Sequence, residues 1–140
     1  MMRWARMSDF SITLPDRPGE LARLGARLRA ADVNLVGLWG YGGDGGGLAR
    51  FYCVPEQAEQ FRNFVESAEL ETTEGTTLFV SGDNDVGALV KTLETIAAGS
   101  INLRAIQSVA FGGEFGCFIW AEPSDWAELE RVMGRLNDPT

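Results

Sequence analysis

The sequence of 140 residues predicts an α+β protein made of two similar units, each an antiparallel sheet with two helices on one face. An internal repeat, short runs of alternating apolar residues and turn-forming glycines together indicate this fold. The segments "PGELARLGARLRAADVNL" and "VGALVKTLETIAAGSINL" align without a gap. Six pairs of identical residues lie 68 positions apart: Gly19 and Gly87, Leu21 and Leu89, Ala30 and Ala98, Asn34 and Asn102, Leu35 and Leu103, Pro55 and Pro123.

The first unit begins with a strand, because Phe10, Ile12 and Leu14 alternate with polar residues. Pro18 suits the first turn of a helix, and the expected apolar side of that helix consists of Leu21, Leu24, Leu28 and Ala31. The runs "VNLVGLWGY" and "GLARFYCV" follow as a hairpin. A second helix is expected after Pro55, with Ala58, Phe61 and Val65 as its apolar side. The stretch "AELETTEGTTLFVSG" predicts nearly continuous strands that close this unit and open the next.

The second unit repeats this order. Its first strand includes Leu78–Val80, and the apolar side of its first helix consists of Val86, Leu89, Leu93 and Ile96. The hairpin "INLRAIQSVAF" and "EFGCFIWAE" turns at Gly112 and Gly113. A last helix begins at Pro123, with Trp126, Leu129 and Val132 on its apolar side.

The predicted order of strand, helix, strand, strand, helix, strand is the ferredoxin-like βαββαβ arrangement, twice over. We place the first unit at residues 8–74 and the second at 75–136. After the last helix only "GRLNDPT" remains, which is too short and polar for a convincing final strand. We therefore expect the second unit to lack this strand and to leave an edge on which another chain pairs.

Composition narrows the range of functions. The net charge of −8 disfavours nucleic acid and anionic membranes as partners, and no apolar run approaches the roughly 20 residues of a membrane helix. The start "MMRWARMSD" does not resemble a signal peptide, so a cytoplasmic location is expected. The absence of histidine removes the commonest general base and zinc ligand. Cys53 and Cys117 lie in alternating apolar runs and are expected to be buried free thiols.

The segment "LPDRPGELARLGARLRAADVNLVGL" closely resembles the first loop, first helix and second strand of ACT domains. The segment "GDNDVGALVKTLETIAAGSINLRAI" resembles a more divergent ACT unit. The whole chain is similar to small proteins that consist of two ACT units without an attached enzyme domain. The resemblance implies a non-enzymatic regulatory protein that binds a small molecule, often an amino acid, between ACT units, and no cofactor or metal is expected.

The candidate ligand-binding residues surround the two predicted helix starts. Gly19 and Gly87 lie where unpaired backbone N–H groups and the helix dipole favour a carboxylate, although a tight turn alone also explains them. The resemblance implies that Asn34 and Asn102 contact a ligand from the partner unit, together with Asp16 or Asn84. These asparagines otherwise tie the turn after the helix. The full candidate set is Asp16, Arg17, Gly19, Glu20, Asn34, Asn84, Asp85, Gly87 and Asn102.

The charged members of this set have alternative roles. Asp16 and Asp85 are also suited to cap the following helices, as is Asp83. Arg17 is either a solvated loop charge or a partner for a ligand carboxylate.

Three functions are compatible with this pattern. The first is an amino-acid sensor, and the second is an adaptor that binds an enzyme of amino-acid metabolism or forms a homodimer without a ligand of its own. The third, a small enzyme of the same general fold, lacks a persuasive catalytic constellation.

The glycines of "LWGYGGDGGGLARFYC" need a separate explanation. Gly40, Gly42 and Gly45 match G-x-G-x-x-G, but a strand follows them where a dinucleotide site needs a helix. We therefore expect Gly42–Gly47 to form a mobile flap at the same end of the sheet as the loop before the first helix.

Overall fold

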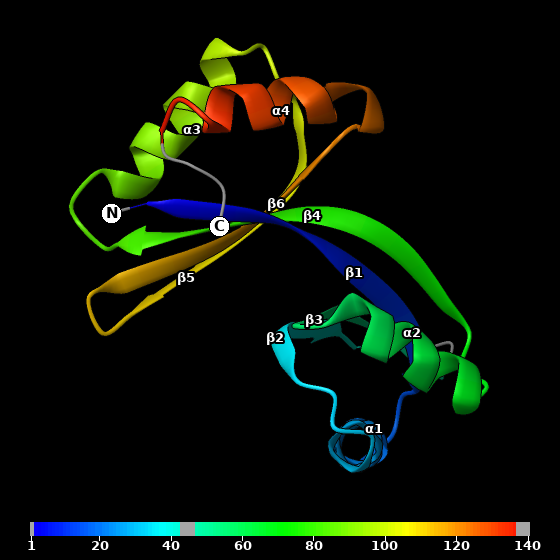
Figure 1. Cartoon of the computed structure of the whole chain (residues 1–140). Helices are drawn as coiled ribbons and strands as arrows, with labels where there is room; N and C mark the ends of the chain where they lie inside the picture. The colour runs from blue at the N-terminus through cyan, green and yellow to red at the C-terminus, as the bar shows by residue number, and fades with distance from the viewer. Residues whose placement is uncertain (1, 43–46, 137–140) are drawn as a thin grey trace. The chain divides into compact units, whose positions relative to one another are not determined.

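A computed structural model of the chain describes residues 2–42 and 47–136, and it contains the predicted elements in the predicted order (Figure 1). The strands are β1 (Arg3–Pro15), β2 (Leu35–Tyr41), β3 (Leu48–Pro55), β4 (Thr72–Asp83), β5 (Leu103–Phe111) and β6 (Glu114–Ala121). The helices are α1 (Glu20–Ala30), α2 (Ala58–Ser67), α3 (Ala88–Ala98), the short 3₁₀ helix η1 (Pro123–Asp125) and α4 (Trp126–Met133).

The chain divides into two compact units. Ser8–Gly75 forms the N-terminal unit, whereas Met1–Met7 and Thr76–Thr140 together form the C-terminal unit. The strands pair in the order β2-β3-β1-β4-β6-β5, so the two long strands β1 and β4 each contribute to both units. In the C-terminal unit, the place beside β4 that an absent last strand would leave empty is occupied by the start of β1.

The two units share details that only a duplication explains simply. In the hairpin of the N-terminal unit, a register shift separates Leu35 from Gly37. The hairpin of the C-terminal unit has the same irregularity between Leu103 and Ala105, again 68 positions further along the chain. The tandem βαββαβ arrangement predicted from the repeat is confirmed.

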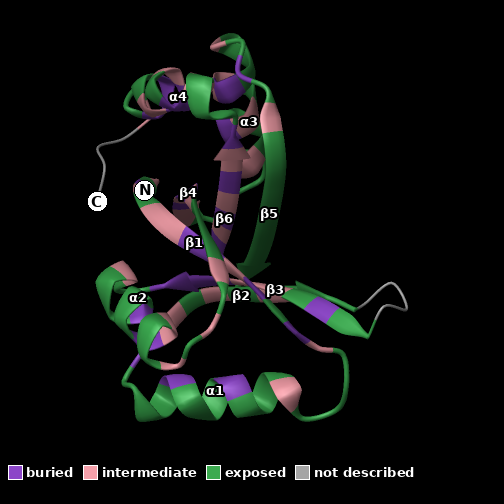
Figure 2. Ribbon diagram, turned by 90° about the vertical axis from the view of Figure 1, so that its right-hand side faces the viewer, coloured by how far each residue is buried: buried purple, intermediate pink, exposed green. Residues whose placement is uncertain are grey.

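In the N-terminal unit the two helices cover one face of the sheet. Phe10 and Ile12 of β1 are each 1% exposed and pack with Leu24 of α1 and Phe61 of α2. The buried positions of α1 lie along one side of the helix in Figure 2, as its apolar spacing predicts. Leu21, also predicted for this side, is 38% exposed because it lies in the first turn, at the end of the core.

An ion pair supports the strand that closes this unit. The Arg62 guanidinium of α2 donates hydrogen bonds from Nε and Nη2 to the two carboxylate oxygens of Glu74 in β4, each at 2.8 Å. The hydrogen bond from Arg62 lowers the pKa of Glu74. The first residues of β4 are thereby tied to α2.

The C-terminal unit has its own core. Leu78 and Val80 of β4 pack with Ile96 of α3 and with Leu129 of α4. Trp4, only 6% exposed, belongs to the same cluster. Two residues later in β1, Arg6 lies 5.3 Å from the ring centroid of Trp126 and pairs with Glu130 of α4 at 3.2 Å. The start of β1 is thus a packed part of this unit.

Both cysteines are free and fully buried, as predicted. Burial raises the pKa of the Cys53 thiol from 9.0 to about 11, and that of Cys117 also to about 11. At about pH 8 the reactive thiolate is then about 100-fold scarcer than for an unperturbed thiol. We expect iodoacetamide to label the folded protein at least about 100-fold more slowly than the protein in urea.

Labelling can be followed by mass spectrometry, with the urea-unfolded chain as the control. Because burial favours the neutral thiol, its contribution to stability is complete below pH 9.0 and is lost as the pH rises toward 11. Rapid labelling of either cysteine in the folded protein would contradict this account of the two cores.

Candidate functional site

The two loops that precede α1 and α3 have the same backbone conformation. Gly19 has φ 89° and ψ −12°, and Gly87 has φ 85° and ψ 0°, values that glycine adopts without strain. The Glu20 N–H donates to the Arg17 carbonyl at 3.4 Å, and in the other unit Ala88 donates to Asp85 at 3.0 Å. Residues 17–20 and 85–88 therefore form equivalent type II turns, with glycine at the position that requires positive φ.

Each turn is joined to the hairpin of its own unit. The Asp16 N–H donates to the Gly47 carbonyl at 2.9 Å, and the Asn84 N–H donates to the Gly113 carbonyl at 2.9 Å. The predicted placement of the glycine-rich hairpin at the same end of the sheet as the first loop is confirmed by the first of these bonds. Residues 43–46, the centre of the predicted flap, lie outside the described residues.

The first turn of each helix offers donors to an anion. The first intrahelical bonds are donated by Arg23 to the Gly19 carbonyl and by Lys91 to the Gly87 carbonyl. In the described part of the chain, the N–H groups before these donors find no backbone acceptor: those of Leu21, Ala22, Leu89 and Val90. Apart from the adjacent residues, a Cβ built on Gly19 or Gly87 would meet no atom within 4 Å, so the space beside each of these Cα atoms is open.

The two turns differ in charge. Arg17 Nε donates to Glu20 Oε1 at 2.9 Å, and the Glu20 side chain is only 15% exposed. A carboxylate therefore already lies at the positive end of α1, and Arg17 is engaged with it. The first turn of α3 contains no acidic residue, since Ala88 replaces Glu20. The first turn of α3 therefore lacks the carboxylate that α1 carries, while Asp85 stands in the preceding turn at the position that Arg17 has in the other unit.

The two asparagines lie at the other ends of these helices. Asn34 and Asn102 follow α1 and α3, and each helix has 11 residues, which corresponds to a length of about 16 Å. Asn34 Nδ2 donates to Glu56 Oε2 at 2.8 Å, and the Glu56 N–H donates back to the Asn34 carbonyl at 2.9 Å. Asn34 therefore connects the start of β2 to the end of β3. Within one unit the structure does not bring the asparagine and the turn together.

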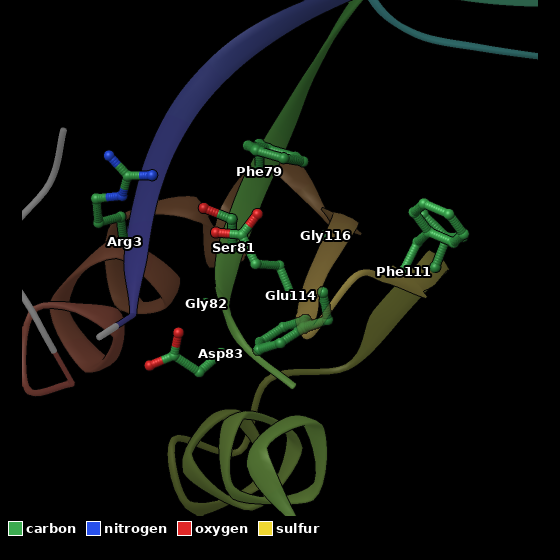
Figure 3. A pocket seen from close by; sticks show the side chains of 10 residues that line it. Arg3, Phe79, Ser81, Gly82, Asp83, Phe111, Glu114 and Gly116 are labelled. Atoms are coloured by element: carbon green, nitrogen blue, oxygen red, sulfur yellow. The ribbon is translucent and has the colours of Figure 1, made fainter. Parts of the chain in front are cut away.

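A different part of the C-terminal unit, which residue patterns alone do not reveal, is hollowed. This hollow has a volume of about 300 Å³, and residues of β1, β4, β5 and β6 line it (Figure 3). Its lining includes Arg3, Ser81, Asp83 and Glu114 together with several aromatic side chains. Neither Arg3 nor Glu114 is among the residues that the sequence patterns indicate, and Asp83 was expected only as a helix cap.

Other kinds of site find no support among the described residues. No group of three or more cysteine, aspartate or glutamate side chains there is placed to hold a metal ion. None of the helices in residues 2–42 and 47–136 has both the length and the apolar character needed to span a membrane.

Sequence comparison alone does not classify this chain. No family model matches it, and no curated protein matches it significantly. Similar solved structures do exist, and all three described next share less than a fifth of their residues with this chain.

Protein BT0572 from Bacteroides thetaiotaomicron is 16% identical, with a TM-score of 0.79 over 95% of this chain and 90% of its own. The ligand-free regulatory subunit of aspartate kinase from Thermus thermophilus is 17% identical, with a TM-score of 0.62 over 98% of this chain and 96% of its own. Aspartokinase III of E. coli, in complex with lysine and aspartate, is 12% identical, with a TM-score of 0.56. That match covers 98% of this chain but 33% of the longer enzyme.

The fold and the repeated turns define a protein of two tandem ferredoxin-like units, each with a glycine turn before its first helix. More particularly, the chain shares its fold with the regulatory subunit of aspartate kinase from Thermus thermophilus, and the two structures match over nearly the whole of both chains. The resemblance to tandem ACT proteins is confirmed at the level of the fold.

Proposed function

We propose that this chain is a cytoplasmic, non-enzymatic regulatory protein that binds a free amino acid at the N-terminus of α3. The observation that carries the proposal is the turn at residues 85–88: a Cβ built on Gly87 would meet no atom within 4 Å, and among the described residues the N–H groups of Leu89 and Val90 find no backbone acceptor. Two such donors, at the positive end of a helix without an acidic first turn, favour a carboxylate.

Two structural neighbours support a regulatory role. One is a separate regulatory subunit of a kinase that acts on an amino acid, and another was solved in complex with lysine and aspartate. The equivalent turn at residues 17–20 is the weaker site because Glu20 already supplies a carboxylate there. Asp16 and Asn84 flank these turns, where Asp16 favours the ammonium group of the ligand and Asn84 can bond to either charged group.

The test is calorimetric titration of the full chain with each of the twenty common amino acids. We expect at least one to bind, and we expect Ala88→Glu to weaken its binding about tenfold because the new carboxylate occupies the positive end of α3. Ala88→Gln is the matched control, because it has nearly the same shape without the charge. The absence of binding by all twenty, or equal binding by these two variants, would count against the proposal.

The asparagines need a separate measurement. Because each lies a helix length away from the turn of its own unit, Asn34 or Asn102 reaches a ligand only from a unit other than the one whose helix binds it. A weaker affinity of Asn102→Ala or Asn34→Ala, with unchanged unfolding curves, would support such a contribution. Normal affinity would assign Asn34 to its structural bond with Glu56 alone.

The second candidate is an adaptor that binds an enzyme or a second copy of the chain. The observation in its favour is the exposed strand β5, where Ile106, Val109 and Phe111 are 41%, 73% and 91% exposed. A stable complex with a co-purified enzyme, together with no response to amino acids, would favour this alternative.

A further inference from the structure

The hollow of the C-terminal unit arises from the side chains on the face of the sheet that the helices leave uncovered. The core residues Leu78, Val80, Cys117 and Ile119 point toward the helices, so the residues between them point to the other face. Strand register places residues in rows across β4, β6 and β5 on that face. The rows are Asp83, Glu114 and Phe111; then Ser81, Gly116 and Val109; then Phe79, Phe118 and Gln107.

The side chains of the middle row project least from the sheet because its central residue is a glycine and one neighbour is a serine. A Cβ on Gly116 would lie 3.3 Å from the Phe79 ring, so the ring leans over the space that Gly116 leaves. The first and third rows carry large side chains. The hollow of about 300 Å³ is therefore a depression between two rows of larger side chains, which we call the dip. Its size suits a small ligand.

The N-terminal unit provides an internal comparison. The corresponding row there consists of Thr13, Arg50 and Tyr41, with Arg50 in register between the other two. A long side chain thus occupies the place of Gly116, and tyrosine stands in place of Val109. The two units have diverged at the positions that create the dip in one of them.

A tight hairpin turn borders the dip on one side. Gly112 and Gly113 have φ 64° and 83°, the two positive values of a type I′ hairpin turn. This turn fixes Phe111 and Glu114 directly opposite each other in register. An apolar ring 91% exposed to solvent is therefore held beside a carboxylate.

Glu114 lies in register between Asp83 and Phe111, so charged and aromatic side chains adjoin in the first row of the dip. Figure 3 shows Arg3 and Asp83 on one side and Phe111 on the other. In the part of the chain that the structure describes, neither Arg3 nor Glu114 takes part in an ion pair or a side-chain hydrogen bond. Asp83 takes part in another interaction, so Glu114 is the carboxylate that remains for a ligand.

We infer that this dip is a second ligand site, distinct from the N-terminus of α3, which binds a zwitterionic amino acid with an apolar side chain. Glu114 accepts the ammonium group, Arg3 pairs with the carboxylate, and the apolar side chain lies over Gly116 against Phe79 and Val109. The ligand class follows from the opposite charges beside an apolar floor. The site stands independently of the proposed function, since it uses none of the helix donors.

Backbone NMR of the full chain, titrated with L-leucine, tests this site. We expect shifts at Val109, Phe111 and Gly116, and we expect much smaller shifts with 3-methylbutylamine or 4-methylpentanoate, each of which lacks one of the two charged groups. Glu114→Gln and Arg3→Ala should each weaken binding at least about tenfold. The matched charge control is Glu94→Gln, which removes an exposed carboxylate from α3 and should leave the affinity unchanged.

Ser81→Leu fills the dip without altering a charge or a glycine, and it should abolish the shifts. Shifts that persist unchanged in Ser81→Leu and Glu114→Gln would overturn the inference, as would equal binding of either fragment or no shifts with L-leucine. Shifts confined to Leu89 and Val90 would also overturn it, while supporting the helix site of the proposed function.

Discussion

Trp4→Ala is expected to lower the free energy of unfolding by about 3 to 5 kcal/mol, the range for removing a buried tryptophan or phenylalanine from a core. Trp4 is 6% exposed and packs in the cluster that contains Leu78, Ile96 and Leu129. The start of β1 also supplies the strand beside β4, so loss of this anchor frees backbone groups as well as apolar surface. Urea unfolding followed by circular dichroism measures the change.

The control for this variant lies one residue earlier on the same strand. Arg3 is exposed, and Arg3→Ala should change stability by no more than about 0.5 kcal/mol. Hydrogen exchange should show that Trp4→Ala lowers the protection of β4, β6 and α4. A loss below about 1 kcal/mol, or lost protection only within residues 8–75, would show that the N-terminal residues are not part of the second core.

Phe61→Ala, in the N-terminal unit, is also expected to lower the free energy of unfolding by about 3 to 5 kcal/mol. Phe61 is fully buried, and its ring centroid lies 4.5 Å from that of Phe10 and 5.9 Å from that of Phe64. The substitution removes both aromatic contacts and leaves a cavity between α2 and β1. Amides of residues 8–75 should lose protection first.

Asn63→Ala provides the matched control because Asn63 is an exposed residue of the same helix. Its effect should stay within about 0.5 kcal/mol. If Phe61→Ala and Asn63→Ala unfold at the same urea concentration, the assignment of Phe61 to the centre of this core is wrong.

The fold was predictable because the sequence pattern that indicates it occurs twice in the chain. A single copy of Gly19 or of Leu35 indicates little, but the recurrence of both 68 positions later fixes two units of equal design. The matching type II turns and register shifts confirm that the two copies share backbone conformation as well as sequence. The helix starts, as the place of the candidate site, were therefore available from sequence alone.

Non-local pairings were not predictable. The short run around Trp4 has no repeat partner, and nothing local indicates that it packs against Leu129. The hydrogen bond from Asn34 to Glu56 spans 22 residues of the chain, and it favours a structural role for Asn34 over ligand binding. The dip over Gly116 depends on the registers of three strands, which a residue pattern does not specify.

A crystal structure of the chain, grown with the amino acid that binds most tightly in the calorimetric screen, tests whether the start of α3 binds the ligand carboxylate. We expect the ligand carboxylate at the start of α3, with its oxygens about 2.7 to 3.2 Å from the backbone nitrogens of Leu89 and Val90. A structure at saturating ligand in which both nitrogens face only solvent, with the amino acid bound elsewhere or not at all, would contradict it.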